Sequence, residues 1–215
     1  MPLPPAALRL VLLAAFAIAG CGGDDRERPA PSRAPPRAPP AQTVASGLEV
    51  PWDLAFLPDG RALITERPGR VRLLSARGRL RAEPLAEMEV EDAGEGGLLG
   101  VVVDPDFERN GFVYLYRTTS GGNEVARYRI SGDRLEEQAV VLDGIRAGVI
   151  HDGGRMRFGP DGKLYVTSGE AGQDNLAQER GSLNGKVLRL SPGQFRGRGG
   201  RPEIFSLGHR NPQGL

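Results

Sequence analysis

The chain has 215 residues, with 28 lysine and arginine side chains against 27 aspartate and glutamate side chains, and a formal net charge of +1. This balance gives no electrostatic reason to expect a nucleic-acid partner, and none is predicted. The 31 glycines and 18 prolines favour short strands and tight turns over long helices.

Residues 1–20 have the features of a lipoprotein-type signal peptide. Arg9 is the one charged side chain in this stretch, and an uninterrupted apolar run follows it at positions 10–19. A membrane-spanning helix needs ~20 apolar residues, so the run is too short to cross a bilayer and is typical of a cleavable export signal. A buried core helix is the alternative interpretation.

Cys21 is the only cysteine of the chain, which excludes an intramolecular disulfide. It ends the segment Ile18–Ala19–Gly20–Cys21, which resembles the lipobox of bacterial lipoproteins. The resemblance implies that the thiol receives a diacylglycerol, and an additional N-acyl group would complete a stable membrane anchor. We therefore expect an exported protein, lipid-anchored at Cys21 and facing the periplasm or the cell exterior. Gly22 in place of aspartate favours the outer membrane in a Gram-negative cell. An unmodified cysteine after an ordinary signal is the alternative.

Residues 21–42 follow as a proline-rich segment without apolar periodicity. Such a composition buries too little apolar surface to offset the entropy of ordering the chain. The segment is predicted to be a disordered, semi-extended tether between the lipidated cysteine and a folded domain over residues 43–215.

Three segments of the folded part share one pattern, which is a short apolar strand, a turn containing Pro-Asp, and a second strand. They occupy residues 52–66, 100–116 and 156–168. Proline presets φ for a turn, and aspartate bonds to its own backbone there. The turn residues Pro58, Pro105 and Pro160 stand 47 and 55 residues apart, the spacing of one four-stranded propeller blade.

Further strands are predicted between these repeats, at residues 71–74, 124–130, 138–142 and 186–190. No segment longer than about ten residues shows helical periodicity. The sequence thus predicts an all-β propeller. At roughly 50 residues per blade, the folded part supplies three to three and a half four-stranded blades. Such a number of blades makes an incomplete ring. The sequence also ends inside the motif 209–215, so we expect this chain to be a fragment of a larger propeller. An immunoglobulin-like sandwich fits the strand count but not the repeat.

His151 and Glu170 are the candidate catalytic pair. His151 precedes the first strand of the third repeat, in a polar loop with two glycines, and an imidazole with an ordinary pKa of about 6.5 suits a general base. If the two strands form a hairpin, Glu170 returns close to His151. A carboxylate bonded to an imidazole fixes its tautomer and raises its basicity. A structural histidine and a solvated glutamate are the alternatives.

Glu95, Arg210 and Asn211 are candidate binding residues. Glu95 lies in the glycine-rich segment 93–100, where a ligand can approach the backbone closely. This segment lacks the strand-to-helix context of a phosphate loop, so nucleotide binding is rejected. Arg210 and Asn211 offer a charged fork beside an amide, which suits a planar, oxygen-rich ligand, although an ordinary ion pair remains the alternative.

Several sequence segments resemble, in the same order along the chain, those of the soluble glucose, aldose and sorbosone dehydrogenases that use pyrroloquinoline quinone. They are the opening phrase 48–56, EGGLLG with DPDF in 95–107, HDGGRM with GPDGKLYVTSGE in 151–170, and GHRNPQGL in 208–215. The resemblance covers nearly all of the folded part.

The resemblance implies a six-bladed propeller that holds pyrroloquinoline quinone and calcium at the channel mouth. It implies that His151 takes the proton of an aldose's anomeric hydroxyl while hydride passes to the quinone, and that Glu170 supports His151. Glucose enzymes have aspartate at the position of Glu170, so a longer carboxylate has to bend here. The resemblance also implies that Glu95 contacts cofactor or substrate, and that Arg210 and Asn211 bind the quinone oxygens.

The calcium ligands and the residues that hold the quinone carboxylates are expected beyond Leu215. An external electron acceptor is also implied, and the 215-residue chain alone is expected to be inactive. Two other functions stay open. One is a non-catalytic lipoprotein propeller that binds a sugar or a protein partner. The other is a hydrolase or lactonase with a metal in the channel, which the lack of repeated Asn, Asp and Glu clusters disfavours.

Overall fold

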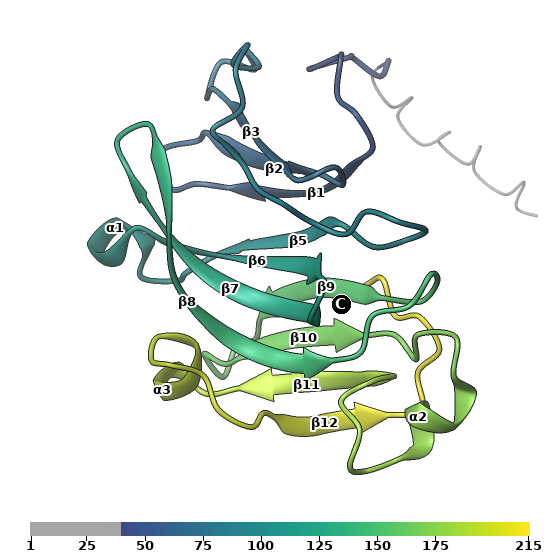
Figure 1. The fold of residues 1–215 in the computed structure, drawn as a ribbon. Coiled ribbons are helices and arrows are strands. Elements are labelled where there is room, and N and C mark those ends of the chain that lie inside the picture. The colour runs from purple at the N-terminus through teal and green to yellow at the C-terminus, as the bar shows by residue number, and fades with distance from the viewer. Residues whose placement is uncertain (1–39) are drawn as a thin grey trace, which may run out of the picture. The chain divides into compact units, whose positions relative to one another are not determined.

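The computed structural model describes residues 40–215, which form twelve strands and three short helices (Figure 1). The predicted signal peptide and Cys21 lie outside the described residues. Among the described residues no helix is long and apolar enough to cross a membrane.

The strands form three antiparallel four-stranded sheets, each with its strands in chain order, so the predicted propeller blades are confirmed. The first sheet contains β1 (Pro51–Phe56), β2 (Ala62–Glu66), β3 (Arg70–Leu74) and β4 (Ala86–Glu87). The second contains β5 (Leu98–Val103), β6 (Phe112–Thr119), β7 (Gly122–Ser131) and β8 (Arg134–Ile145). The third contains β9 (Gly153–Phe158), β10 (Leu164–Ser168), β11 (Lys186–Leu190) and β12 (Glu203–Leu207). The short helices are α1 (Phe107–Asn110), α2 (Asp174–Gln178) and α3 (Pro192–Phe195).

The side chains of the middle sheet alternate between its two faces and contribute to a hydrophobic core on each face. Successive side chains of a strand point to opposite faces. Val113 and Leu115 of β6 therefore belong to the core shared with the first sheet, while Tyr114 and Tyr116 belong to the core shared with the third. All four side chains are fully buried, so the middle sheet is packed against both outer sheets.

The predicted Pro-Asp turns close the inner hairpins of the outer two sheets. Asp59 Oδ1 accepts from Arg61 N at 3.0 Å, and Asp161 Oδ1 accepts from Lys163 N at 3.2 Å. The intervening Gly60 adopts φ +85°, which glycine tolerates without strain. In the middle sheet the turn is lengthened by α1, which the sequence analysis missed.

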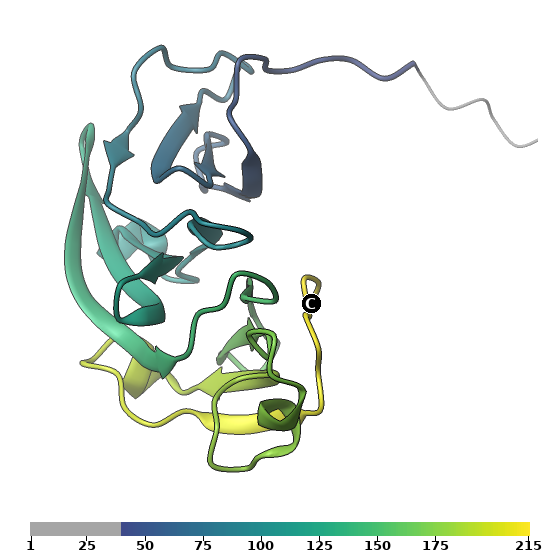
Figure 2. The same cartoon turned by 45° about the vertical axis from the view of Figure 1, so that its right-hand side comes forward.

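The first strands β1, β5 and β9 lie side by side at the inner edge of the three sheets (Figures 1 and 2). Asp53 of β1 connects all three. Its Oδ2 accepts from Val101 N of β5 at 3.1 Å, and its Oδ1 forms an ion pair with Arg155 of β9. The inner strands therefore share a buried charge, which fixes the sheets against one another.

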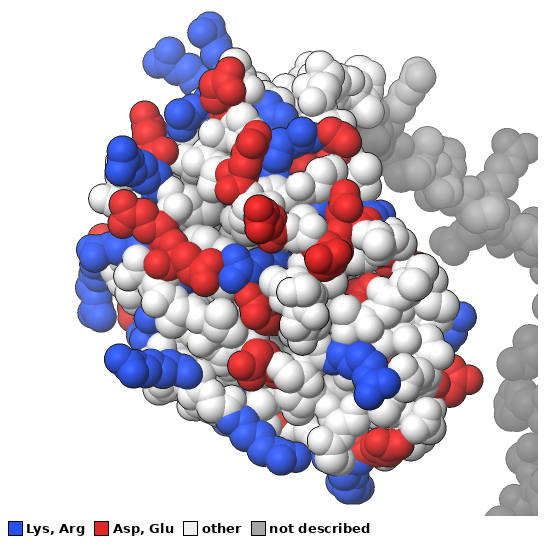
Figure 3. Space-filling model, in the orientation of Figure 1, with Lys and Arg blue, Asp and Glu red and all other residues white. Residues whose placement is uncertain are grey.

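The open faces of the outer two sheets carry apolar side chains. Phe56 of β1 is 69 % exposed and Phe205 of β12 is 54 % exposed. Elsewhere acidic and basic side chains are interspersed, as Figure 3 shows for one face of the molecule. This distribution agrees with the balanced charge of the sequence.

Candidate functional site

The hairpin of β9 and β10 brings His151 and Glu170 together. The strand pairing reaches Gly153 opposite Ser168, and the two candidate residues each lie two positions further on. His151 Nδ1 contacts Glu170 Oε1 directly. At Gly169 an added Cβ would lie 1.8 Å from the His151 carbonyl oxygen, so only glycine permits this approach of the two chains.

Glu170 is buried, with 1 % of its surface exposed. Its Oε1 also accepts a hydrogen bond from Gly172 N at 3.0 Å, while Oε2 is buried without a hydrogen-bond partner in the described part of the chain. Burial opposes ionisation most strongly, but the hydrogen bonds with His151 and Gly172 outweigh it and hold the pKa of Glu170 below its ordinary value. A charged carboxylate thus faces the imidazole and fixes its orientation.

Glu95 joins the same cluster from the loop between β4 and β5. Its backbone N donates to the Val149 carbonyl at 3.0 Å, which ties this loop to the segment before His151. Its Oε2 accepts from His151 N at 2.7 Å and from Asn211 Nδ2 at 3.1 Å. Glu95 therefore holds the backbone of the histidine and the amide of Asn211 at once.

Arg210 and Asn211 reach the cluster from the C-terminal segment, which runs back along the third sheet toward its inner strand (Figure 2). Asn211 Oδ1 accepts from Gly153 N at 3.1 Å, and the Arg210 carbonyl accepts from Glu170 N at 2.9 Å. The Arg210 side chain is exposed and makes no hydrogen bond or ion pair with any residue from 40 to 215.

The structure thus brings together the backbones of all five predicted residues and the side chains of four, with the Arg210 guanidinium free at the edge. Nδ1 of His151 is engaged by a carboxylate, which leaves Nε2 to accept a proton. The amide and the guanidinium beside it can bind an anionic or oxygen-rich planar ligand.

Two buried polar residues near the site were missed by the sequence analysis. Lys186 Nζ donates to the carbonyls of Leu176, Ala177 and Asn184, and burial lowers its pKa. Asn184 Nδ2 donates to the Gly169 carbonyl at 3.0 Å. Asn184 thus holds the backbone next to Glu170, while Lys186 connects α2 to the loop before β11. A lysine at the first position of the strand 186–190, next to two apolar residues, was the available signal for Lys186.

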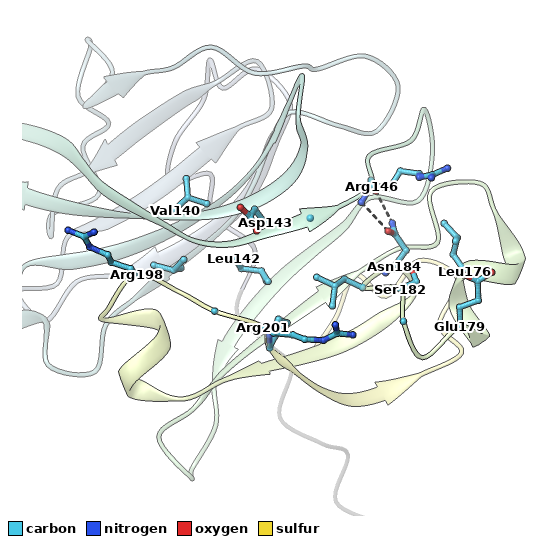
Figure 4. A pocket seen from close by; sticks show the side chains of 16 residues that line it. Val140, Leu142, Asp143, Arg146, Leu176, Glu179, Ser182, Asn184, Arg198 and Arg201 are labelled. Carbon is cyan, nitrogen blue, oxygen red and sulfur yellow. Dashed lines mark hydrogen bonds between the residues drawn. The ribbon is translucent and has the colours of Figure 1, made fainter.

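The centre of the site is buried, with His151 6 % exposed, and it does not coincide with the cavity described next. A cavity of about 700 Å³ lies elsewhere, between β8 and the loops 179–184 and 198–202 (Figure 4). None of the five predicted residues lines it. Within residues 40–215 no group of three or more His, Cys, Asp or Glu side chains could hold a metal ion.

Comparison with known proteins gives a consistent result. Residues 48–215 match the glucose/sorbosone dehydrogenase family. The crystal structure of an oxidoreductase from Thermus thermophilus, described as a glucose dehydrogenase, is 52 % identical with a TM-score of 0.73, covering 81 % of this chain and 56 % of that one. The aldose sugar dehydrogenase of Streptomyces coelicolor, solved with pyrroloquinoline quinone bound, is 40 % identical with a TM-score of 0.70, covering 81 % and 57 %.

Among curated proteins, the aldose sugar dehydrogenase YliI of Escherichia coli is 33 % identical over 192 residues, covering 81 % of this chain and 52 % of the relative. The chain spans about half the length of this relative and of the other bacterial and cyanobacterial proteins that it matches over a similar range.

Proposed function

This chain belongs to the glucose/sorbosone dehydrogenase family, and we propose that the protein containing it oxidises an aldose at the anomeric carbon with pyrroloquinoline quinone as the hydride acceptor. The observation that carries the proposal is the contact between His151 Nδ1 and the buried carboxylate of Glu170, at the inner end of the third sheet. This contact holds the imidazole in one orientation and leaves Nε2 without a partner in residues 40–215.

The residues present fit an anionic, oxygen-rich cofactor. The Arg210 guanidinium has no partner within residues 40–215, and Asn211 beside it is held in place by Gly153 and Glu95. These two side chains would bind the quinone oxygens of pyrroloquinoline quinone. When bound, the cofactor supplies the two-electron acceptor. We also propose calcium as a partner of that cofactor.

In the proposed reaction, His151 Nε2 accepts the proton of the anomeric hydroxyl. When bound, the cofactor would take the hydride of the anomeric carbon, so that the sugar becomes a lactone and protons and electrons balance. Glu170 stabilises the imidazolium that forms, since its carboxylate already lies against Nδ1. Glu170 reaches Nδ1 although it is one methylene longer than aspartate, and Gly172 N holds the same oxygen.

The reaction is tested with the full-length protein reconstituted with pyrroloquinoline quinone and calcium. We expect aldoses to reduce an artificial dye, which replaces the external electron acceptor. If quinone binds but no aldose reduces the dye, the substrate class is wrong. If no quinone binds, the protein is a non-catalytic propeller that binds a sugar or a protein partner.

We further propose export and lipid anchoring at Cys21, facing the periplasm or the cell exterior. The short apolar run and the lipobox-like sequence ending at Cys21 support this. Cys21→Ser should move the protein from the membrane fraction to the soluble fraction. Unchanged partitioning of the variant, together with the absence of a lipid mass on the wild type, would contradict the proposal.

A further inference from the structure

Asp152, the residue after His151, is a buried carboxyl group that the proposed reaction does not use. It is 1 % exposed, and its Oδ2 is buried without a hydrogen-bond partner in the described part of the chain. Burial raises its pKa, although hydrogen bonds from Asn123 and Gly148 act in the opposite direction. Burying a carboxyl oxygen without a hydrogen-bond partner costs free energy, so its position beside the proposed base indicates a functional role.

The hydrogen bonds of Asp152 connect two sheets. Oδ1 accepts from Asn123 Nδ2 of β7 at 2.7 Å and from Gly148 N at 3.0 Å. Its backbone carbonyl accepts from Tyr116 OH of β6 at 2.9 Å. Asn123 is itself held, because Thr118 Oγ1 donates to its Oδ1 at 2.7 Å. The loop before β9 is thus tied to the middle sheet by three buried side chains: Tyr116, Thr118 and Asn123.

The backbone of His151 needs such support. It adopts φ +65°, the left-handed region that residues other than glycine rarely occupy. Conformations of this kind persist only where the surroundings hold them. The carboxyl of Asp152 bonds to Gly148, three residues before His151, and its carbonyl is fixed directly after His151. The bonds of one residue therefore hold both sides of the left-handed turn.

We propose that Asp152 is a positioning residue for His151, which holds the left-handed turn so that the imidazole meets Glu170 and faces the substrate. The proposal rests on the function assigned to His151 above. Asp152 acts as a hydrogen-bond acceptor that ties the loop to Asn123, and it exchanges no proton with the substrate. A displacement of about 1 Å at a reacting group can lower the rate about 100-fold, so such a link affects turnover.

The first test compares Asp152→Ala with Asp152→Asn in the full-length, reconstituted protein. Alanine removes the acceptor, so kcat for an aldose should fall about 10- to 100-fold while KM stays within about twofold. Asparagine keeps an acceptor oxygen toward Asn123 and Gly148, so its kcat should stay within about threefold of the wild type. Wild-type turnover of the alanine variant, or equal loss in both variants, would overturn the proposal.

Asp161→Ala is the matched control. Asp161 is an exposed aspartate in the turn between β9 and β10, and it also accepts two hydrogen bonds, from Lys163 N and Tyr165 OH. We expect it to leave kcat unchanged. If Asp152→Ala does not fold, Asn123→Ala removes the same link from the β7 side, and kcat should again fall with KM unchanged. Wild-type kcat in a folded Asn123→Ala protein would overturn the proposal.

A double variant separates positioning from a direct role. If Asp152 acts through His151, then Asp152→Ala should lower the residual activity of His151→Ala by less than twofold. A further loss of the full 10- to 100-fold in that background would show that Asp152 acts independently and would overturn the proposal.

An NMR measurement on the cofactor-free protein keeps this inference separate from the proposed function. The hydrogen-bonded Nδ1 proton of His151, assigned with a His151→Gln variant, should be visible in the wild type and in Asp152→Asn, and lost in Asp152→Ala. Its retention in Asp152→Ala would refute the positioning role. If the wild type oxidises no aldose, the proposed function fails, while this signal still decides whether Asp152 holds His151.

Discussion

Two buried glutamates occupy similar places in the first and third sheets, and their partners differ. Glu66 ends β2, and Glu170 follows β10, which is likewise the second strand of its sheet. They are 0 % and 1 % exposed. Both have a pKa below the ordinary value, because hydrogen bonds and charges outweigh the opposing effect of burial.

Glu66 is surrounded by permanent partners. Its Oε2 accepts from Arg70 Nε at 2.7 Å, and its Oε1 accepts from Glu49 N at 2.8 Å and from Arg72 at 3.3 Å. Glu170 has no arginine or lysine partner within residues 40–215. One of its oxygens meets an imidazole, which can gain and lose a proton, and the other has no partner among the described residues. Burial alone thus does not identify a reactive carboxylate, whereas the chemistry of its partner does.

The largest effect is expected from His151→Ala, which removes the titratable partner. General-base catalysis typically contributes 10²- to 10⁴-fold, so kcat should fall by about that factor, with little change in cofactor affinity. Steady-state kinetics of the reconstituted full-length protein and a titration with pyrroloquinoline quinone measure both quantities. Wild-type turnover in this variant would mean that the base is another residue.

Replacing each of the two glutamates by glutamine should distinguish a role in catalysis from a role in stability. Glu170→Gln should lower kcat by about 10- to 100-fold, between the wild type and His151→Ala, since the imidazolium loses its counter-charge. The acidic limb of its rate profile should also move to lower pH. Glu66→Gln should leave kcat unchanged and lower the free energy of unfolding by about 2–3 kcal/mol, because two arginines lose their charged acceptor.

Urea unfolding and kinetics on both variants provide the measurement. The comparison fails if Glu66→Gln lowers kcat as much as Glu170→Gln does in folded protein. It also fails if Glu170→Gln retains wild-type turnover with an unchanged pH profile.

The contrast between these glutamates shows what the sequence could and could not predict. The hairpins were predictable because strand, Pro-Asp turn and strand are contiguous, and β11 has the predicted bounds 186–190. The short β4 and β12, and the three helices of four or five residues, lack a periodic signal of useful length. His151 and Glu170 were expected to meet because they flank one hairpin.

The other contacts of the site depend on residues far apart in the chain. Glu95 and Asn211 are 116 positions apart, and Glu95 and His151 are 56 apart. Their contact follows from the packing of neighbouring sheets, which local pattern does not determine. The resemblance to a known family placed these residues in one site, whereas spacing alone gave no reason to connect them.

Two arginines, Arg70 and Arg210, show the same contrast between a structural residue and a site residue, and the expected effect on activity is smaller. Arg70 bonds to Glu66 and Glu49, whereas the Arg210 side chain has no partner in residues 40–215. Arg210→Ala should therefore weaken binding of pyrroloquinoline quinone about tenfold or more and slow hydride transfer, with an unchanged melting temperature. Fluorescence titration of the cofactor and calorimetry test this. A lower melting temperature with unaltered cofactor binding would assign Arg210 a structural role instead.

The smallest expected effect is on the acid sensitivity of folding. The folded-state pKa of Glu66 lies below its ordinary value of 4.5, so its contribution to stability is fully present above about pH 4.5 and is lost as pH falls through the folded-state pKa. Glu66→Gln removes this titration. The free energy of unfolding should therefore depend less steeply on pH below about 4.5 than in the wild type.

Asp152 should act with the opposite sign, because its folded-state pKa lies above the ordinary 3.8. Its contribution is present below about pH 3.8 and is lost as pH rises through the folded-state pKa. Asp152→Asn should therefore gain stability relative to the wild type as the pH is raised through this window, whereas Glu66→Gln loses stability over the same direction. Urea unfolding of both variants from pH 3 to 7 measures the two slopes. Slopes of the same sign would show that one of the two carboxyl groups is not held in the protonation state that its contacts indicate.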